Sequence, residues 1–211
     1  EEYPLGLNLC DDCYHLQLTH IVNPDLLFKN YLYCSGTTQT LRDNFEWFSN
    51  FVLEDAPQCT SVLDIACNDG IIAQNVFAHN SDPKKFLDDC CELMDDDSRL
   101  YIQTSQAHMV QNNQFDTVYH EHISFFNINS FNELVKRTNL NLIDVIKTPV
   151  HGVSYLFVLS KQDMITPFYI KNEHRIQNLI DVERETGLYS KKTYDDYKQN
   201  ILNIVKSFKK V

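Results

Sequence analysis

The sequence predicts an α/β fold, because short apolar strands alternate with amphipathic helices along most of its 211 residues. The helical signal is clearest over residues 41–52, where Leu41, Phe45, Phe48 and Val52 recur at the spacing of one packed face. The strand signal is clearest over residues 61–66, SVLDIA, which run into a polar turn. The length favours one main domain with room for a small appendage.

In the first quarter of the chain, a short helix is expected over residues 26–33, followed by a small hydroxyl-rich loop. The helix over residues 41–52 comes next and ends at Pro57. We interpret its aromatic residues Phe45, Trp47 and Phe48 as core, because aromatic stripes at helical spacing usually face the interior.

The second half of the chain continues the alternation of helices and strands. In order, we expect a helix over residues 83–94, a strand over 100–104, a helix over 131–137, strands over 141–146 and 154–160, and helical structure over 171–211. The apolar side of the first of these helices comprises Phe86, Leu87, Cys90 and Leu93. Ser130 is the expected N-cap of the helix over 131–137, with Glu133 completing a capping box.

Charge and cysteine content restrict the class of protein. The formal net charge is −11, from 18 basic and 29 acidic residues, which argues against a nucleic-acid partner. No apolar run is long enough to cross a bilayer and no secretory leader is visible, so we expect a cytoplasmic protein without a membrane partner. Seven cysteines, including the adjacent Cys90 and Cys91, do not form a disulfide framework, and reduced thiols fit better.

Cys10 and Cys13 form a Cys-x-x-Cys turn, which is half of a tetrahedral zinc site. No second pair follows downstream. Three alternatives remain open: two ordinary thiols, a site completed by His15 and His20, or a site completed by a cysteine pair upstream of the sequence.

The strongest catalytic candidate is the run DTVYHEHISFF, which brings together Tyr119, His120, Glu121 and His122. A proton-transfer site needs a base that titrates near neutrality and a partner that fixes its tautomer, and histidine beside glutamate supplies both. In an extended strand, tyrosine and glutamate would face one side and the two histidines the other; in a loop or turn all four can converge. The alternative is a polar loop with histidines satisfied by backbone carbonyls.

The strand over residues 61–66 carries Asp64 and leads into Cys67-Asn68-Asp69-Gly70. An acidic residue in a strand that ends in a small or polar turn with glycine is how class I methyltransferases begin their cofactor site. The alternative is a plain hairpin, with residues 71–77 as the return strand.

Several motifs in fixed order carry a resemblance to a known family. They are Cys10-Asp-Asp-Cys13, YLYCSGTT, VLDIACNDG, QNVFAH, FDTVYHEHISFF and HGVSY. The chain resembles the sugar C-methyltransferases over residues 3 to about 190. These S-adenosylmethionine-dependent enzymes methylate a deoxy-keto sugar carried on a nucleoside diphosphate. The resemblance implies a class I methyltransferase with a Rossmann-like sheet and a small N-terminal zinc-binding, helical lobe.

The resemblance also implies roles for individual residues. The catalytic residues would be the base His122, its partner Glu121, and Tyr119, with His120 structural. The cofactor S-adenosylmethionine would be surrounded by Tyr33, Ser35, Thr37, Asp64, Asn68, Asp69, Gly70 and Gln74. The nucleotide sugar would contact Asn75, His79, His151 and Ser154. Cys10 and Cys13 would hold the structural zinc.

The chain departs from the family pattern at two places. Between Gly70 and Ile71 the family has a further helix and two strands, and a direct parallel connection is not physically feasible there. At the HGVS loop, Val153 and Leu156 stand where relatives have glycine and arginine. We expect an N-terminal lobe over residues 1–56, a methyltransferase core over 57–165 that lacks a segment after Gly70, and a helical linker over 166–211 leading to a further domain.

Two other functions remain open. The departures favour a non-catalytic domain that keeps the fold and binds a nucleotide sugar or a protein, although such a domain has no chemical reason to retain residues 119–122. An O- or N-methyltransferase would not need a base beside a keto sugar. The sugar, the methylated carbon, the nucleotide and the oligomeric state are not determined by the sequence.

Overall fold

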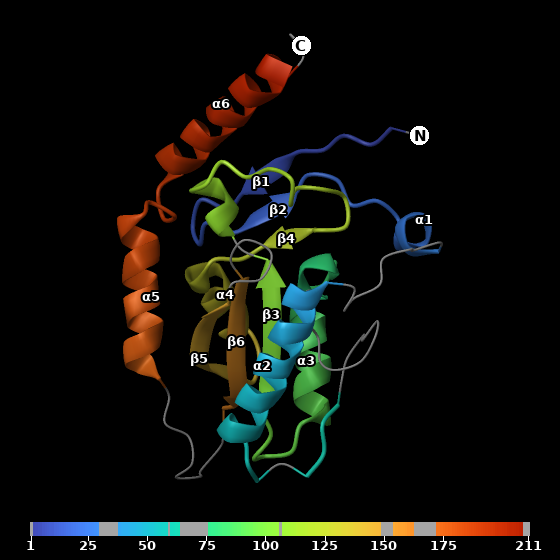
Figure 1. Ribbon diagram of the computed structural model, residues 1–211, viewed down its shortest axis with the longest axis vertical. Coiled ribbons are helices and arrows are strands. Elements are labelled where there is room, and N and C mark those ends of the chain that lie inside the picture. The colour runs from blue at the N-terminus through green and yellow to red at the C-terminus, as the bar shows by residue number, and fades with distance from the viewer. Residues whose placement is uncertain are drawn as a thin grey trace.

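A three-stranded sheet forms the centre of the molecule, for which a computed structural model describes residues 2–29, 38–58, 60–63, 76–105, 107–148, 154–162 and 172–208. Strand β6 (Ser154–Lys161) lies between β3 (Leu100–Ser105) and β5 (Leu140–Thr148) (Figure 1). Both neighbours pair antiparallel with β6, so β3 and β5 run in the same direction. The combination of helices and strands confirms the predicted α/β class. The strands predicted over 100–104, 141–146 and 154–160 are present.

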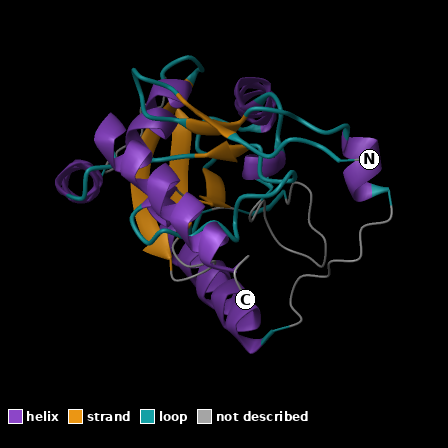
Figure 2. Cartoon of the chain, turned by 90° about the horizontal axis from the view of Figure 1, so that it is seen from above, coloured by secondary structure: helices purple, strands orange, loops and turns teal. Residues whose placement is uncertain are grey.

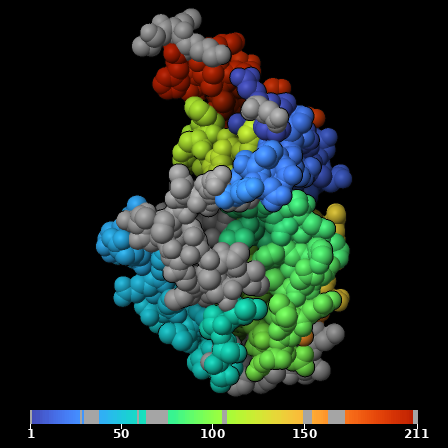
Figure 3. Space-filling model, turned by 90° about the vertical axis from the view of Figure 1, so that its right-hand side faces the viewer, coloured from blue at the N-terminus to red at the C-terminus, as the bar shows by residue number. Residues whose placement is uncertain are grey.

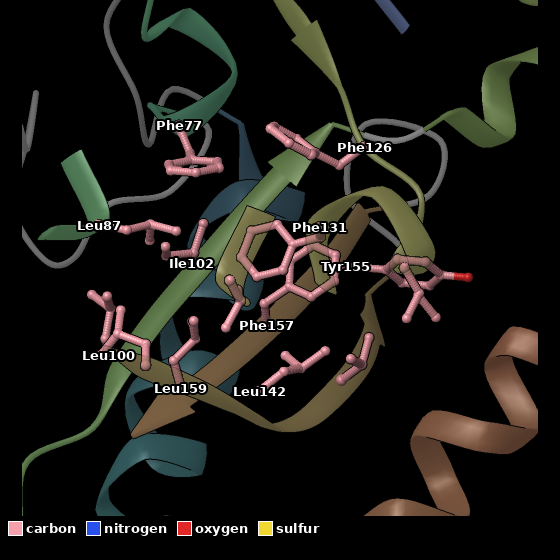
Figure 4. Close-up of a cluster of buried hydrophobic side chains, with 14 of the residues drawn as sticks. Phe77, Leu87, Leu100, Ile102, Phe126, Phe131, Leu142, Tyr155, Phe157 and Leu159 are labelled. Atoms are coloured by element: carbon pink, nitrogen blue, oxygen red, sulfur yellow. The ribbon is translucent and has the colours of Figure 1, made fainter. Parts of the chain in front are cut away.

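Helices cover both faces of this sheet, because side chains along β6 alternate between the two sides. Tyr155, Phe157 and Leu159 enter one cluster with residues of α3 (Pro83–Leu93), α4 (Ile128–Val135) and α5 (Glu173–Glu185) (Figure 4). Leu156 and Val158 face the opposite side, where α2 (Gln39–Asp55) packs. The view from above shows helices on both sides of the strands (Figure 2). The sheet is therefore the middle layer of three, with helices on either side.

A second, smaller sheet lies at one end of the first and was not predicted. It has the order β1 (Leu7–Leu9), β2 (Leu16–Leu18), β4 (Ser124–Phe125), and all pairs are antiparallel. Its apolar side chains pack with those of the 3₁₀ helix η2 (Ala107–Val110) and of α6 (Lys191–Phe208). In Figure 3 the N-terminal segment (blue) lies between α6 (red) and the layer of α2 (cyan) and α3 (green). The N-terminus is thus packed onto the segment that carries residues 119–125.

The predicted helices over residues 41–52 and 83–94 correspond to α2 and α3, and the helical structure predicted over 171–211 corresponds to α5 and α6. The short N-terminal helix α1 spans Pro24–Phe28 with Lys29 as its C-cap, and residues 30–33 of its predicted range lie outside the described residues. The expected strand over residues 61–66 is not formed at residues 61–63, and residues 64–66 also lie outside the description. None of the described helices is both long and apolar enough to cross a membrane.

The predicted start of the helix over 131–137 was wrong. Helix α4 begins three residues earlier, at Ile128, and its N-cap is Asn127. The Asn127 side chain accepts a hydrogen bond from the Ser130 amide, and the Ser130 hydroxyl accepts one from the Asn127 amide. The capping box is therefore formed by Asn127 and Ser130, in place of the predicted pair of Ser130 and Glu133.

Three predictions about individual apolar residues were also wrong. Trp47 is 39% exposed and stacks on Phe51 at the edge of the α2 face, whereas Phe48 is the fully buried residue of that face. Leu93 is 68% exposed, because it lies at the end of α3 where the helix leaves the core. Phe77 is not in a strand but begins the 3₁₀ helix η1 (Phe77–His79).

The core predicts a large effect of truncation at Phe131. Its ring is fully buried and stacks on Phe157, with ring centroids 3.7 Å apart. Phe131→Ala should lower the free energy of unfolding by about 3–5 kcal/mol, the range for aromatic-to-alanine cavities. Urea denaturation measures this, with Phe208→Ala, at a side chain in α6 that is 70% exposed, as the matched control. Equal changes in the two variants would contradict the packing described here.

Candidate functional site

The structure describes the predicted catalytic and metal residues, but none of those expected at the cofactor. Outside the described residues lie Tyr33, Ser35, Thr37, Asp64, Asn68, Asp69, Gly70, Gln74, Asn75 and His151. Within it lie the predicted catalytic residues Tyr119, Glu121 and His122, the substrate candidates His79 and Ser154, and the thiols of Cys10 and Cys13.

The YHEH run forms a turn rather than a strand. The His122 amide donates to the Tyr119 carbonyl, at 3.1 Å, which closes the turn. This geometry brings Tyr119 and His122 together, with ring centroids 4.2 Å apart. The sequence left open a strand or a turn for this run, and the structure has the turn. A turn allows side chains that are three residues apart to converge.

Both nitrogens of the His122 ring have a hydrogen-bond partner. Nδ1 lies 3.0 Å from the Thr117 carbonyl oxygen, and Nε2 lies 2.7 Å from the Tyr119 hydroxyl. A carbonyl can only accept, so Nδ1 carries the proton and donates it to Thr117. The neutral ring therefore has its lone pair on Nε2, where it accepts from Tyr119. His122 is 7% exposed whereas Tyr119 is 38% exposed, so the basic nitrogen lies just beneath an accessible hydroxyl.

His79 lies against the same ring. Its imidazole packs edge-on to His122, with centroids 4.9 Å apart. The segment that carries it, η1, is fixed to the turn because the Ile123 amide donates to the Ala78 carbonyl at 2.8 Å. The Ile123 carbonyl in turn accepts from the Leu18 amide of β2. Two segments that are 45 residues apart in the sequence, at Ala78 and Ile123, are thus joined beside His122.

Sequence reasoning assigned the orientation of His122 to Glu121, but the structure shows the Thr117 carbonyl on Nδ1. No sequence signal marks this group, because every residue has a backbone carbonyl. Glu121 is half-buried in the same turn, and its part in the chemistry stays a prediction. His120 packs edge-on against Tyr3 of the N-terminal segment, at 6.2 Å.

Ser154 lies at the start of β6, opposite both Ser105 and Thr148. It is fully buried, and its carbonyl accepts from the Thr148 hydroxyl at 3.2 Å. The Gln103 side chain donates to the same hydroxyl at 2.8 Å. Side chains of β3 and β5 and the backbone of β6 therefore form a hydrogen-bonded polar group at this end of the sheet.

The Cys10-x-x-Cys13 turn is closed by the Tyr14 amide, which donates to the Cys10 carbonyl. Backbone amides of Cys13 and Asp12 hydrogen-bond the Cys10 thiol and lower its pKa, whereas burial raises the pKa of Cys13. Among the described residues, no group of three or more histidine, cysteine or acidic side chains is placed to hold a metal. The described part of the chain thus supplies at most two of the four ligands that a structural zinc needs, and His15 and His20 do not complete the site.

The hydrogen bonds of His122 predict its tautomer. At a pH where the ring is neutral, the proton should reside on Nδ1, whereas free histidine favours Nε2. Nitrogen-15 NMR of histidine-labelled protein distinguishes the two forms, with the His122→Gln variant used for assignment. The exposed His174 serves as the internal control. An Nε2-protonated His122 would refute the proposed contact to the Thr117 carbonyl.

Two comparisons with known proteins gave a match. Residues 68–145 match a family model described as a methyltransferase domain. The chain is also 21% identical over 210 residues to the C-methyltransferase NovU of Streptomyces niveus, a match that covers 72% of this chain and 50% of that protein. The chain thus spans about half the length of this relative. Its strands and covering helices fit the class I methyltransferase fold, and the match of residues 68–145 to a methyltransferase domain implies S-adenosylmethionine as methyl donor.

Proposed function

We propose that the chain is the catalytic part of a C-methyltransferase that acts on a deoxy-keto sugar linked to a nucleoside diphosphate. The observation that carries the proposal is the His122 ring, held through Nδ1 with its basic Nε2 directed at the Tyr119 hydroxyl. The name of the relative, a C-methyltransferase, supports transfer to carbon.

A new carbon–carbon bond requires a carbon nucleophile. In the proposed reaction, His122 Nε2 removes a proton from the carbon beside the ketone of the sugar, and the electron pair moves toward the ketone oxygen. The positive charge that develops on the ring is stabilised because Nδ1–H already donates to Thr117. The substrate takes the place of the Tyr119 hydroxyl at Nε2 when this proton is transferred.

The enolate oxygen needs hydrogen-bond donors at the moment it becomes negative. Tyr119 is 38% exposed and its hydroxyl lies 2.7 Å from Nε2, so this hydroxyl is the first candidate donor to a substrate oxygen placed beside the base. His79, edge-on to His122, is the second candidate donor. We assign Glu121 the role of balancing the charge on the protonated base, and Asn75, His151 and Ser154 the contacts to the sugar nucleotide.

S-adenosylmethionine, when bound, supplies an electrophilic methyl group on a sulfonium centre. We assign its binding to the residues around the turn that ends in Gly70, namely Asp64, Asn68, Asp69 and Gly70, with Tyr33, Ser35, Thr37 and Gln74. The enolate carbon would take this methyl group as the carbon–sulfur bond breaks, with S-adenosylhomocysteine as the leaving group. His122 then returns its proton to solvent.

We propose that a segment of the family fold is absent after Gly70. The match extends over 210 residues, whereas 72% of this chain is about 152 residues, so the relative contains aligned residues without a counterpart here.

We further propose that Cys10 and Cys13 contribute two ligands to a structural zinc whose other two ligands lie outside the described residues. Zinc analysis of the protein and of the Cys10→Ser, Cys13→Ser double variant tests this: equal zinc content in both would refute it.

The role of His122 can be tested apart from methyl transfer. His122→Ala should lower methyl transfer to a nucleoside-diphosphate-linked 4-keto-deoxysugar by about 10²–10⁴-fold, the usual contribution of a general base. It should also abolish solvent deuterium exchange at the carbon beside the ketone, which needs only the base and the sugar. Mass spectrometry follows both reactions.

The matched control is His120→Ala in the same turn, which should keep most of both activities. A His122→Ala variant that exchanges deuterium at the wild-type rate would exclude His122 as the base. Wild-type protein that binds S-adenosylmethionine but neither exchanges deuterium nor methylates any keto sugar would overturn the proposed function.

A further inference from the structure

Among the described residues, one acidic side chain is buried, and the proposed mechanism does not use it. Glu183 lies in the last turn of α5 and has no exposed surface. In the sequence, Glu183 is one of several charged residues in a polar helix. Burying a carboxylate is costly unless its oxygens are hydrogen-bonded, so its contacts indicate what it does.

The Glu183 carboxylate binds three groups from three different segments. The amide of Ile128, the first residue of α4, donates to both oxygens at 3.0 and 3.2 Å. The hydroxyl of Tyr189, in the connection between α5 and α6, donates to one of them. The hydroxyl of Tyr155, on the central strand β6, hydrogen-bonds the carboxylate as well. Glu183 therefore joins α4, β6 and the end of α5.

One hydrogen-bonded route leads from Glu183 to the segment after His122. Ile128 follows the N-cap Asn127, and Asn127 follows β4, which begins two residues after His122. β4 is fixed to the N-terminal sheet through its pairing with β2. A carboxylate that holds the first amide of α4 thereby fixes the direction in which the chain leaves the catalytic turn.

A second route leads to the segment before His122. The Tyr155 hydroxyl lies 3.0 Å from Nε2 of the buried His108 in η2. The next residue, Met109, accepts a hydrogen bond from the Thr117 hydroxyl at 3.2 Å. Thr117 is the residue whose carbonyl holds His122 Nδ1. Gln111, which follows η2, also donates to Thr186 just beyond Glu183. The end of α5 is thus connected to both flanks of the turn.

We propose that Glu183 is a positioning residue for His122, because its carboxylate ties together the segments before and after the catalytic turn. This inference rests on the proposed function, since it assigns a role in the same site. Glu183 does not contact the reacting groups and acts through the placement of Thr117 and of α4.

The surroundings of Glu183 make its charge depend on pH. The titratable groups facing it are Tyr155 on β6, Tyr189 after α5 and Tyr194 on α6, with His108 behind Tyr155. Burial lowers the pKa of His108 to about 4, so at neutral pH it brings no positive charge. Burial raises the pKa of Glu183 from 4.5 to about 7. The folded state therefore binds this proton more tightly, and the stability from this group is complete below pH 4.5 and lost as the pH rises through about 7.

The test uses Glu183→Gln, which keeps the shape of the side chain but removes its charge, and Glu185→Gln, an exposed residue of the same helix, as the control. Nitrogen-15 NMR of labelled histidine rings reads His122 without substrate or cofactor. In Glu183→Gln, the His122 ring signals should shift and the Nδ1-protonated fraction should fall, while Glu185→Gln matches the wild type. The His108 signals should show an inflection near pH 7 that Glu183→Gln removes.

Activity provides a second readout. Glu183→Gln should lower kcat of methyl transfer roughly ten- to a hundred-fold with little change in KM, because a misplaced base affects the chemical step more than binding. If Glu183→Gln does not fold, Tyr155→Phe takes its place, since it breaks the route to His108 and leaves the carboxylate on Ile128. A folded variant with wild-type His122 signals would overturn the proposal. Shifted His122 signals in a protein that methylates no sugar would support the positioning role and refute the proposed function instead.

Discussion

The structure depends on the hydrogen-bonding and packing of the central strand β6. Its backbone pairs with β3 on one edge and with β5 on the other, so every ladder position from Ser154 to Lys161 has a neighbour. Its side chains are buried on both faces, with Phe157 and Leu159 toward α3 and α4 and Val158 toward α2. Because β6 has neither a free edge nor a free face, the elements around it have little freedom in their placement.

The candidate site is built at the end of this sheet, where β6 begins. Tyr155 is the point at which the core and the site meet: its ring packs in the core, and its hydroxyl reaches His108 and Glu183. The turn that contains His122 is attached on three sides, to β2 through Ile123, to η1 through Ala78 and to η2 through Thr117. Because backbone groups already hold this base in place, its surroundings need to rearrange little when it accepts a proton.

The support of the site includes buried polar groups, which lower the free energy of unfolding. Glu183 and His108 are both almost completely buried, and burial is the largest cause that raises the pKa of Glu183 and lowers the pKa of His108. The Nδ1 atom of His108 has no hydrogen-bond partner in the part of the chain that the structure describes, so this ring is only half satisfied. Such groups lower the stability of a domain, and a site that needs a fixed histidine gives a physical reason for keeping them.

Most of the regular structure followed from the sequence, because side-chain periodicity is local. Helices α2 and α3 and strands β3, β5 and β6 were predicted within a few residues, and the YHEH run was recognised as the candidate site. The errors arose where contacts between distant residues decide the outcome. Asn127, not Ser130, caps α4 because its side chain also donates to the Tyr14 carbonyl, and the short strands β1, β2 and β4 exist only as partners of one another.

The sequence by itself determined which residue types are available for proton transfer and that they lie near one another along the chain. Only the tertiary structure decided that Tyr119 and His122 converge in a turn, that the Thr117 carbonyl sets the tautomer, and that His79 lies against the same ring. It also decided that Glu183, 61 residues after His122 in the sequence, belongs to the support of the site. The reason is physical: a backbone carbonyl and a helix terminus have no sequence signature, and they acquire a role only when the fold brings a side chain to them.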